Sequence, residues 1–173
     1  MSKSKMLKIT SILILIASCS MLPAHLKTKV YDSSNDAKNK IDQIVKESGL
    51  TIESLKESNK TGSKEVGDPK IRAVKIKVIE VGEKFLSSIK EAIEELKEKG
   101  TGKQFSEIYH TILSVANSME KIGIQKATAT VKMAADGKAS TSYESINNVH
   151  EKLLAKLQVV KEKQKPAEEK KRS

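Results

Sequence analysis

The pattern of hydrophobic positions is dominated by one long stretch, from Pro69 to Lys99. Apolar residues recur there at steps of three and four, the spacing that lines one face of an α-helix. The members of this stripe are Ile71, Val74, Val78, Val81, Phe85, Ile89, Ala92 and Leu96. Asp68 is a suitable N-cap, and Gly100 is suited to the position just after the C-terminal cap. The spacing predicts a rod of about 45 Å, which buries its stripe only if other helices lie along it.

Other segments carry the same helical spacing. We expect a helix from Ser33 or Ser34 to Gly49, and a short extra turn from Thr51 to Ser58. Two capping boxes, Thr101–Gln104 and Thr141–Glu144, predict the starts of two later helices. These helices are expected to end at Gly123 and at about Lys163, with a shorter helix from Gln125 to Ala135 between them. The pattern contains no convincing strand, so the sequence predicts an all-α fold, a single helical bundle of about five helices, two of them short.

The first nineteen residues have the organisation of a bacterial lipoprotein signal. Three lysines precede a short apolar run that is too short to span a bilayer, and the run ends at Ala17-Ser18-Cys19. Cys19, the sole cysteine of the chain, is the expected lipidation site. We therefore divide the chain into a signal peptide (1–18), a lipidated tether (19–32), the bundle domain (33–163) and a flexible charged tail (164–173).

Charge narrows the classes of partner. The formal net charge is +10, and residues 1–18 hold three lysines and no acids, so most of the excess remains after their removal. Basic proteins meet nucleic acid, anionic lipid or sulfated polysaccharide. Aromatic residues make up only 3% of the chain, which leaves little to stack on bases. The secretion signal also argues against nucleic acid.

Residues for catalysis are scarce. The sequence has no glycine-rich phosphate loop and no His, Cys and carboxylate cluster at metal-ligand spacing. Its histidines, His25, His110 and His150, are far apart, and the last two are expected at the surface or its boundary. We therefore expect no enzyme, no cofactor and no metal site.

Lysines form rows on two of the expected helices. On a helical wheel, Lys152, Lys156 and Lys163 share one flank of the last helix. On the long helix Lys70, Lys77 and Lys84 share one flank at seven-residue spacing, whereas Lys75 stands on the opposite shoulder of the stripe. Two interpretations stay open: the lysine stems cover the edge of a buried stripe, or the rows meet and form a groove for a polyanion. Outside the cell, a glycosaminoglycan is the most available polyanion.

Short motifs spread over nearly the whole chain carry a family resemblance. They are Lys60–Ser63, Ala73–Lys77, Gly82–Phe85, Leu96–Gly100, Gln104–Ser106, Gly123–Gln125, Val131–Ala135, Glu151–Lys152 and Lys156–Gln158. In these motifs the chain resembles the decorin-binding proteins, surface lipoproteins of Borrelia-type spirochaetes, and the A-type more than the B-type. The segment Val159–Gln164 is more similar to the B-type.

The resemblance implies a lipid-anchored adhesin of the bacterial outer membrane. Such a protein binds decorin through its glycosaminoglycan chain, dermatan sulfate, and also binds heparin-like chains. The family's main binding lysines match Lys75, Lys156 and Lys163, and a neighbouring base matches Lys77. A loop with Lys60 and Lys64 lies where the family closes over its basic pocket. Further supporting candidates are Lys70, Lys84 and Lys152.

Two other functions remain open at this stage. A surface lipoprotein could bind a host protein directly, such as a complement or plasma component, with the lysines as rim charges. Alternatively, a structural envelope lipoprotein could face the periplasm without a ligand. Enzymatic removal of glycosaminoglycan from the target tests the first alternative, because binding to a host protein should survive it. Protease treatment of intact cells tests the second, because a protein that faces the periplasm should be spared.

Overall fold

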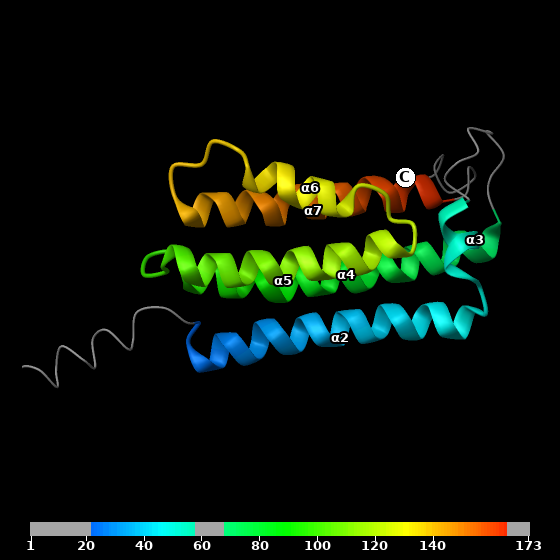
Figure 1. The fold of residues 1–173 in the computed structure, drawn as a ribbon, viewed down its shortest axis with the longest axis horizontal. Helices are drawn as coiled ribbons and strands as arrows, with labels where there is room; N and C mark the ends of the chain where they lie inside the picture. Colours follow the sequence, from blue (N-terminus) through cyan, green and yellow to red (C-terminus); the bar gives the residue numbers. More distant parts are fainter. Residues whose placement is uncertain (1–21, 58–67, 166–173) are drawn as a thin grey trace, which may run out of the picture.

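The computed structural model describes residues 22–57 and 68–165. These residues form four long helices that lie side by side along one axis, together with two short ones (Figure 1). The long helices are α2 (Ala24–Ser48), α4 (Pro69–Glu95), α5 (Gly102–Lys121) and α7 (Ser142–Gln164), and the short ones are α3 (Ile52–Glu57) and α6 (Ala127–Ala135). The part of the chain that the structure describes contains no strand, and the prediction of an all-α bundle is confirmed.

The first helix begins earlier than predicted. Residues 24–32 were assigned to the tether, but they form the first turns of α2, and Leu26 and Val30 are buried in the core. Together with Leu22 these residues extend the apolar stripe of α2 at four-residue steps towards Ala37. Ser34 interrupts that stripe in the sequence, which hid its continuity. The assignment of this segment to a tether was wrong because tertiary burial favours the helix.

The long helix ends slightly before its predicted limit. Regular α4 stops at Glu95, and a turn follows in which the Gly100 amide donates to the Leu96 carbonyl at 2.6 Å. The predicted Asp68 cap is present, since its side chain accepts from the Lys70 amide at 2.8 Å. Both predicted capping boxes are also formed, at the starts of α5 and α7. The signals at Asp68, Thr101 and Thr141 were therefore accurate, whereas the predicted start of the first helix at Ser33 or Ser34 was wrong.

The core consists mainly of Ile, Leu and Val side chains from all six helices. Gly82 lies where α4 packs against both α5 and α7. A Cβ atom at this position would lie 2.7 Å from Met119 Sδ and 3.0 Å from Leu157 Cδ1. The close approach of three helices at Gly82 fixes α7 beside α4.

Contacts between side chains define the register of α4 and α7, which run antiparallel (Figure 1). Tyr143 bonds to Glu94, Asn147 to Lys90, His150 to Leu86 and Lys161 to Glu83. From Tyr143 to His150, each step forward along α7 matches a similar step back along α4, and the long side chain of Lys161 reaches Glu83 from further along α7. The C-terminal end of α7 consequently lies at the same end of the bundle as the start of α4 and as α3.

Candidate polyanion-binding site

The register brings the predicted binding lysines to one half of the bundle. If the register of Asn147 with Lys90 and of His150 with Leu86 is continued along α7, Lys163 is about level with the segment of α4 that holds Lys75 and Lys77. Lys156 lies about two turns before Lys163 on the same flank of α7. We call this half of the bundle, defined by Lys70, Lys75, Lys77, Lys156 and Lys163, the basic end.

Lys75 occupies an unexpected place at the basic end. The sequence placed it on a shoulder of the stripe, but the structure places it inside the stripe with only 1% of its surface exposed. Burial lowers the pKa of the Lys75 ammonium below its usual value. In this conformation Lys75 adds positive potential beneath the surface and makes no surface contact with a large ligand.

The other main candidates are accessible. Lys77 and Lys163 are exposed, and Lys156 is half-buried. Within the described residues, none of the three forms an ion pair, whereas Lys29, Lys90 and Lys161 each hold a glutamate. Lysines without an acidic partner keep their charge available for a polyanion.

These lysines do not all face one groove. Lys161 points to the glutamates of α4, and Lys163, two residues later and about 200° round the helix, points away from α4. Lys77 shares its helical phase with Lys84, which lines a hollow between α2 and α4 with Asp36 and Lys40. A polyanion that contacts both Lys77 and Lys163 therefore has to cross the end of the bundle.

The remaining candidates divide into two groups. Lys70, Lys84 and Lys152 are exposed on α4 and α7. Lys60, Lys64 and the predicted lipidation site Cys19 lie outside the described residues. Their roles stay predictions.

Sequence reasoning overlooked Arg72 as a candidate for binding a polyanion. It is half-buried on α4, one turn before Lys75, and makes no ion pair with any described residue. Its guanidinium can bind a sulfate group through two parallel hydrogen bonds, which an ammonium cannot do. The signal was available in the sequence, because Arg72 is the single arginine among many lysines before the tail.

His150 was predicted at the surface or its boundary, but it is buried between α7 and α4 with 5% of its surface exposed. Its Nε2 lies 3.0 Å from the Leu86 carbonyl oxygen. Burial lowers the pKa of His150, and the positive charge of Lys90 adds to this effect, while the hydrogen bond to Leu86 opposes it. The imidazole is therefore neutral at pH 7.

A carboxylate network stands beside His150 on the α4–α7 surface. Glu94 accepts from Lys90 Nζ at 2.9 Å and from the Tyr143 hydroxyl at 3.0 Å. The first of these bonds holds the pKa of Glu94 below its usual value and raises that of Lys90. The bond to Glu83 likewise raises the pKa of Lys161. This middle part of the α4–α7 surface is thus rich in carboxylates, unlike the basic end.

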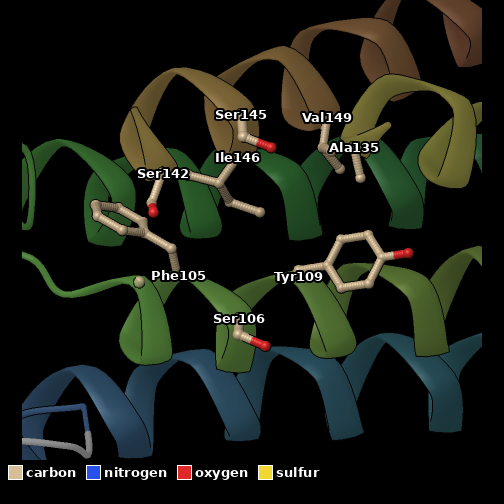
Figure 2. Close-up of a pocket in the computed structure, with 9 residues that line it drawn as sticks. Phe105, Ser106, Tyr109, Ala135, Ser142, Ser145, Ile146 and Val149 are labelled. Atoms are coloured by element: carbon tan, nitrogen blue, oxygen red, sulfur yellow. The ribbon is translucent and has the colours of Figure 1, made fainter. Parts of the chain in front are cut away.

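A separate hollow of about 230 Å³ lies between the N-terminal ends of α5 and α7 and the end of α6 (Figure 2). Its lining consists of apolar side chains and hydroxyls: Gly102, Phe105, Ser106, Tyr109, Ala135, Ser142, Ser145, Ile146 and Val149. This lining supplies no carboxylate, imidazole or amine that could act as a general acid or base near neutral pH. Among the described residues, no group of three or more His, Cys, Asp and Glu is placed to hold a metal ion.

The comparison with known families agrees with this architecture. The family model described as decorin binding protein matches residues 25–173. The chain belongs to the decorin-binding protein family. The relatives of this family are binding proteins, and the chain is a binding protein and not an enzyme.

Individual members of the decorin-binding protein family are similar over most of their length. Decorin-binding protein A of Borreliella burgdorferi is 32% identical over 160 residues, which cover 91% of this chain and 83% of the relative. Decorin-binding protein B of Borreliella burgdorferi strain N40 is 34% identical over 155 residues, which cover 87% of this chain and 82% of the relative.

A solved structure of decorin binding protein A from strain N40 of Borrelia burgdorferi has a TM-score of 0.68 to this structure at 29% identity. The match covers 88% of this chain and 93% of that one. The helical fold is therefore shared with the A-type proteins, and the prediction of the family is confirmed.

Proposed function

We propose that this protein binds decorin through the glycosaminoglycan chain, dermatan sulfate, and binds heparin-like chains by the same surface. The observation that carries the proposal is that Lys77, Lys156 and Lys163 at the basic end are exposed or half-buried and form no ion pair with any residue that the structure describes. Sulfate groups of the polysaccharide replace small counterions around these ammonium groups, and release of the counterions drives binding. Lys75 raises the positive potential from below, and Lys60, Lys64, Lys70, Lys84 and Lys152 support it.

The test is a titration with heparin and with dermatan sulfate at two salt concentrations. We expect a Lys75→Met/Lys156→Ala/Lys163→Ala variant to bind each chain at least tenfold more weakly than the parent at physiological salt. Methionine at position 75 keeps the buried volume, so loss of packing does not imitate loss of binding. Binding of the variant at parental affinity would rule out the basic end as the site.

Binding to decorin itself requires a second comparison. If the glycosaminoglycan chain is the ligand, enzymatic removal of the chain from decorin abolishes binding by the parent protein. Full binding to the stripped core protein would instead favour direct recognition of a host protein.

We also propose that the protein is a lipoprotein held at the outer membrane surface through Cys19. The arrangement of lysines, apolar run and small residues before Cys19 supports this placement. None of the helices described by the structure is long and apolar enough to cross a membrane. Mass spectrometry of the native N-terminus tests the anchor, which is wrong if the mature chain begins at any residue other than a modified Cys19. Protease treatment of intact cells tests the outward orientation.

A further inference from the structure

The proposed lipid anchor is very close in the sequence to the folded bundle. Leu22, three residues after Cys19, is buried with 4% of its surface exposed, and α2 begins at Ala24. A chain advances at most about 3.6 Å per residue, so Cys19 lies within about 11 Å of Leu22 in any conformation. An acyl chain on Cys19 therefore holds the Leu22 end of the bundle next to the membrane surface.

Side-chain contacts identify the segments that share this end. The first turn of α2 lies against the end of α4, because His25 Nε2 is 2.6 Å from Glu95 Oε1. The start of α7 joins them, since the Tyr143 hydroxyl donates to Glu94 at 3.0 Å. The start of α5 follows through Phe105, whose ring centroid lies 6.3 Å from that of Tyr143. We call this part of the bundle the anchor end, made up of the starts of α2, α5 and α7 and the connections 96–101 and 136–141 (Figure 1).

The anchor end carries an excess of lysines that no carboxylate holds. The lysines here that form no ion pair with any described residue are Lys27, Lys97, Lys99, Lys103 and Lys138. All are exposed except Lys27, which is half-buried. The carboxylates without an ion pair at this end, within the described residues, are those of Glu98, Asp136 and Glu144. That of Glu144 already accepts from backbone amides in the capping box of α7. Positive charge is therefore available at the anchor end for an anionic surface.

The basic end lies at the opposite end of the bundle. Helix α7 runs from Tyr143 at the anchor end to Lys163 at the basic end, over roughly 30 Å. On α4, the distance from Glu95 back to Lys77 is roughly 27 Å. Both distances are more than twice the reach from Cys19 to Leu22. The basic end consequently meets the lipid headgroups only if the whole bundle lies flat on the membrane.

The positions of the anchor-end lysines favour a bundle that stands upright. Lys27 belongs to α2 and Lys138 to the loop between α6 and α7, on opposite sides of the bundle (Figure 1). Lys99 and Lys103 lie between them, in the turn after α4 and at the start of α5. Lysines on opposite sides contact one planar surface together only when the end of the bundle faces that surface.

On the basis of the anchor proposed at Cys19, we propose that the anchor end is a membrane-docking surface whose lysines bind anionic phospholipid headgroups, and that the basic end points away from the membrane. Anionic headgroups attract lysines that lie close to the bilayer, and this attraction falls off within a Debye length. Lipid phosphates would compete with sulfate groups for Lys77, Lys156 and Lys163 if the bundle lay flat. The upright bundle keeps these lysines free for a polysaccharide that arrives from outside.

The test is a measurement of NMR relaxation on a nanodisc of phosphatidylcholine and phosphatidylglycerol that carries a gadolinium chelate on some headgroups. The ¹⁵N-labelled chain from Cys19 to Ser173, which contains every described residue, is coupled through its one thiol to a maleimide lipid. We expect the relaxation rates of the Lys99, Lys103 and Lys138 amides to rise at least fivefold more than those of Lys77 and Lys163. Equal increases at the two ends would mean a flat bundle, and larger increases at Lys77 and Lys163 an inverted one. Either result overturns the proposal.

Matched variants test the part played by the lysines. We expect Lys99→Gln/Lys103→Gln/Lys138→Gln to tilt the bundle, so that the ratio of anchor-end to basic-end relaxation falls at least twofold. The control Lys121→Gln/Lys126→Gln/Lys132→Gln removes the same charge from exposed positions outside the anchor end and is expected to keep the parental ratio. An unchanged ratio in the first variant, or an equal fall in the control, would show that these lysines do not dock the bundle.

The outcomes are separate from those of the anchor and of the polyanion site. Because the lipid is attached chemically, absence of a natural lipid appears in the mass spectrum of the native N-terminus and does not alter the relaxation ratio. The Lys99→Gln/Lys103→Gln/Lys138→Gln variant, free in solution, is expected to bind heparin with the parental affinity. A tenfold loss of heparin affinity would place these lysines in the polyanion site and contradict their assignment to the membrane.

Discussion

Two buried polar side chains, Lys75 and His150, show most clearly how single residues behave in this protein. Both lie on helix faces that contact other helices, and both are almost fully covered. Burial disfavours the charged form of each, which lowers both pKa values. Folding therefore works against protonation at these two positions, and the two consequences can be measured.

The first consequence is a dependence of stability on pH. The unfolded imidazole of His150 takes up a proton near pH 6.5, whereas the folded one resists it, so stability is lost as pH falls through 6.5. Between pH 7.5 and 5.5 we expect the free energy of unfolding to fall by about 1 kcal/mol from this group. The charged groups that act on the imidazole are Lys90, Glu94 and Glu151. Urea unfolding across the range measures the loss.

The control for this effect is another histidine. His150→Gln is expected to flatten the dependence, because glutamine does not titrate, while His110→Gln, at an exposed position of α5, retains it. A parental slope in His150→Gln would show that the pH dependence has another source.

The second consequence concerns packing at position 75. Lys75→Ala removes a fully buried four-carbon stem, and we expect the free energy of unfolding to fall by about 2 kcal/mol. Lys75→Met keeps the stem without its charge and is expected to stay within about 1 kcal/mol of the parent. Urea unfolding at pH 7 compares the two variants. Equal stability of the alanine and methionine variants would contradict the buried position.

At the scale of elements, helix ends decide where the functional surfaces lie. The turn between α4 and α5 is tight, because the Gly100 amide donates a hydrogen bond to the Leu96 carbonyl and Gly100 lies against the ring of Phe105. The capping box at Thr101 then starts α5 in the reverse direction. This turn reverses the direction of the chain between α4 and α5.

Gly100 and Gly102 form a matched pair for testing this turn. A Cβ atom at Gly100 would lie 2.5 Å from Leu96 O, a backbone atom that cannot move aside alone, so Gly100→Ala is expected to cost about 1–3 kcal/mol. At Gly102 the nearest atom is the movable Ser142 Oγ at 3.3 Å, and Gly102→Ala is expected to change stability by less than about 0.5 kcal/mol. Thermal unfolding of both variants makes the comparison. Equal melting temperatures would contradict the tight turn.

At the scale of the whole molecule, charge is separated along the α4–α7 surface. At the basic end, Lys77, Lys156 and Lys163 form no ion pair with any described residue, while the glutamates of the middle hold Lys29, Lys90 and Lys161. Paired charges largely cancel, so the lysines of the basic end dominate the field that a polyanion meets. The proposed polyanion contact should therefore depend strongly on salt and on position along the bundle.

The salt dependence of heparin binding can show, for each lysine separately, whether it contacts the polyanion. On a plot of log affinity for heparin against log salt concentration, we expect Lys156→Ala and Lys163→Ala each to reduce the slope by roughly one. Lys103→Ala, at the start of α5 and at the far end of the bundle, is expected to leave the slope unchanged (Figure 1). A loss of slope in Lys103→Ala equal to that of the other two would show that binding is spread over the surface and is not confined to the basic end.

Particular residues show how far prediction from the sequence extended. The stripe from Ile71 to Leu96, the Asp68 cap and both capping boxes follow from local spacing, and all are present in the structure. The start of α2 was missed because Leu26 and Val30 gain their stability from burial against other helices. The assignment of Lys77, Lys156 and Lys163 to one binding surface stays a prediction, and Arg72 joins them as a candidate.

The sequence by itself determined most of the helices, three of their caps, the excess of positive charge and the family, because each depends on residue types and on their spacing along the chain. Only the tertiary structure decided which polar side chains are buried, which lysines are held by glutamates and which share one end of the bundle. The spacing of Lys75 is equally compatible with the edge of a stripe and with its interior. The contacts of α4 with the other helices place it inside, and no pattern within one helix contains that information.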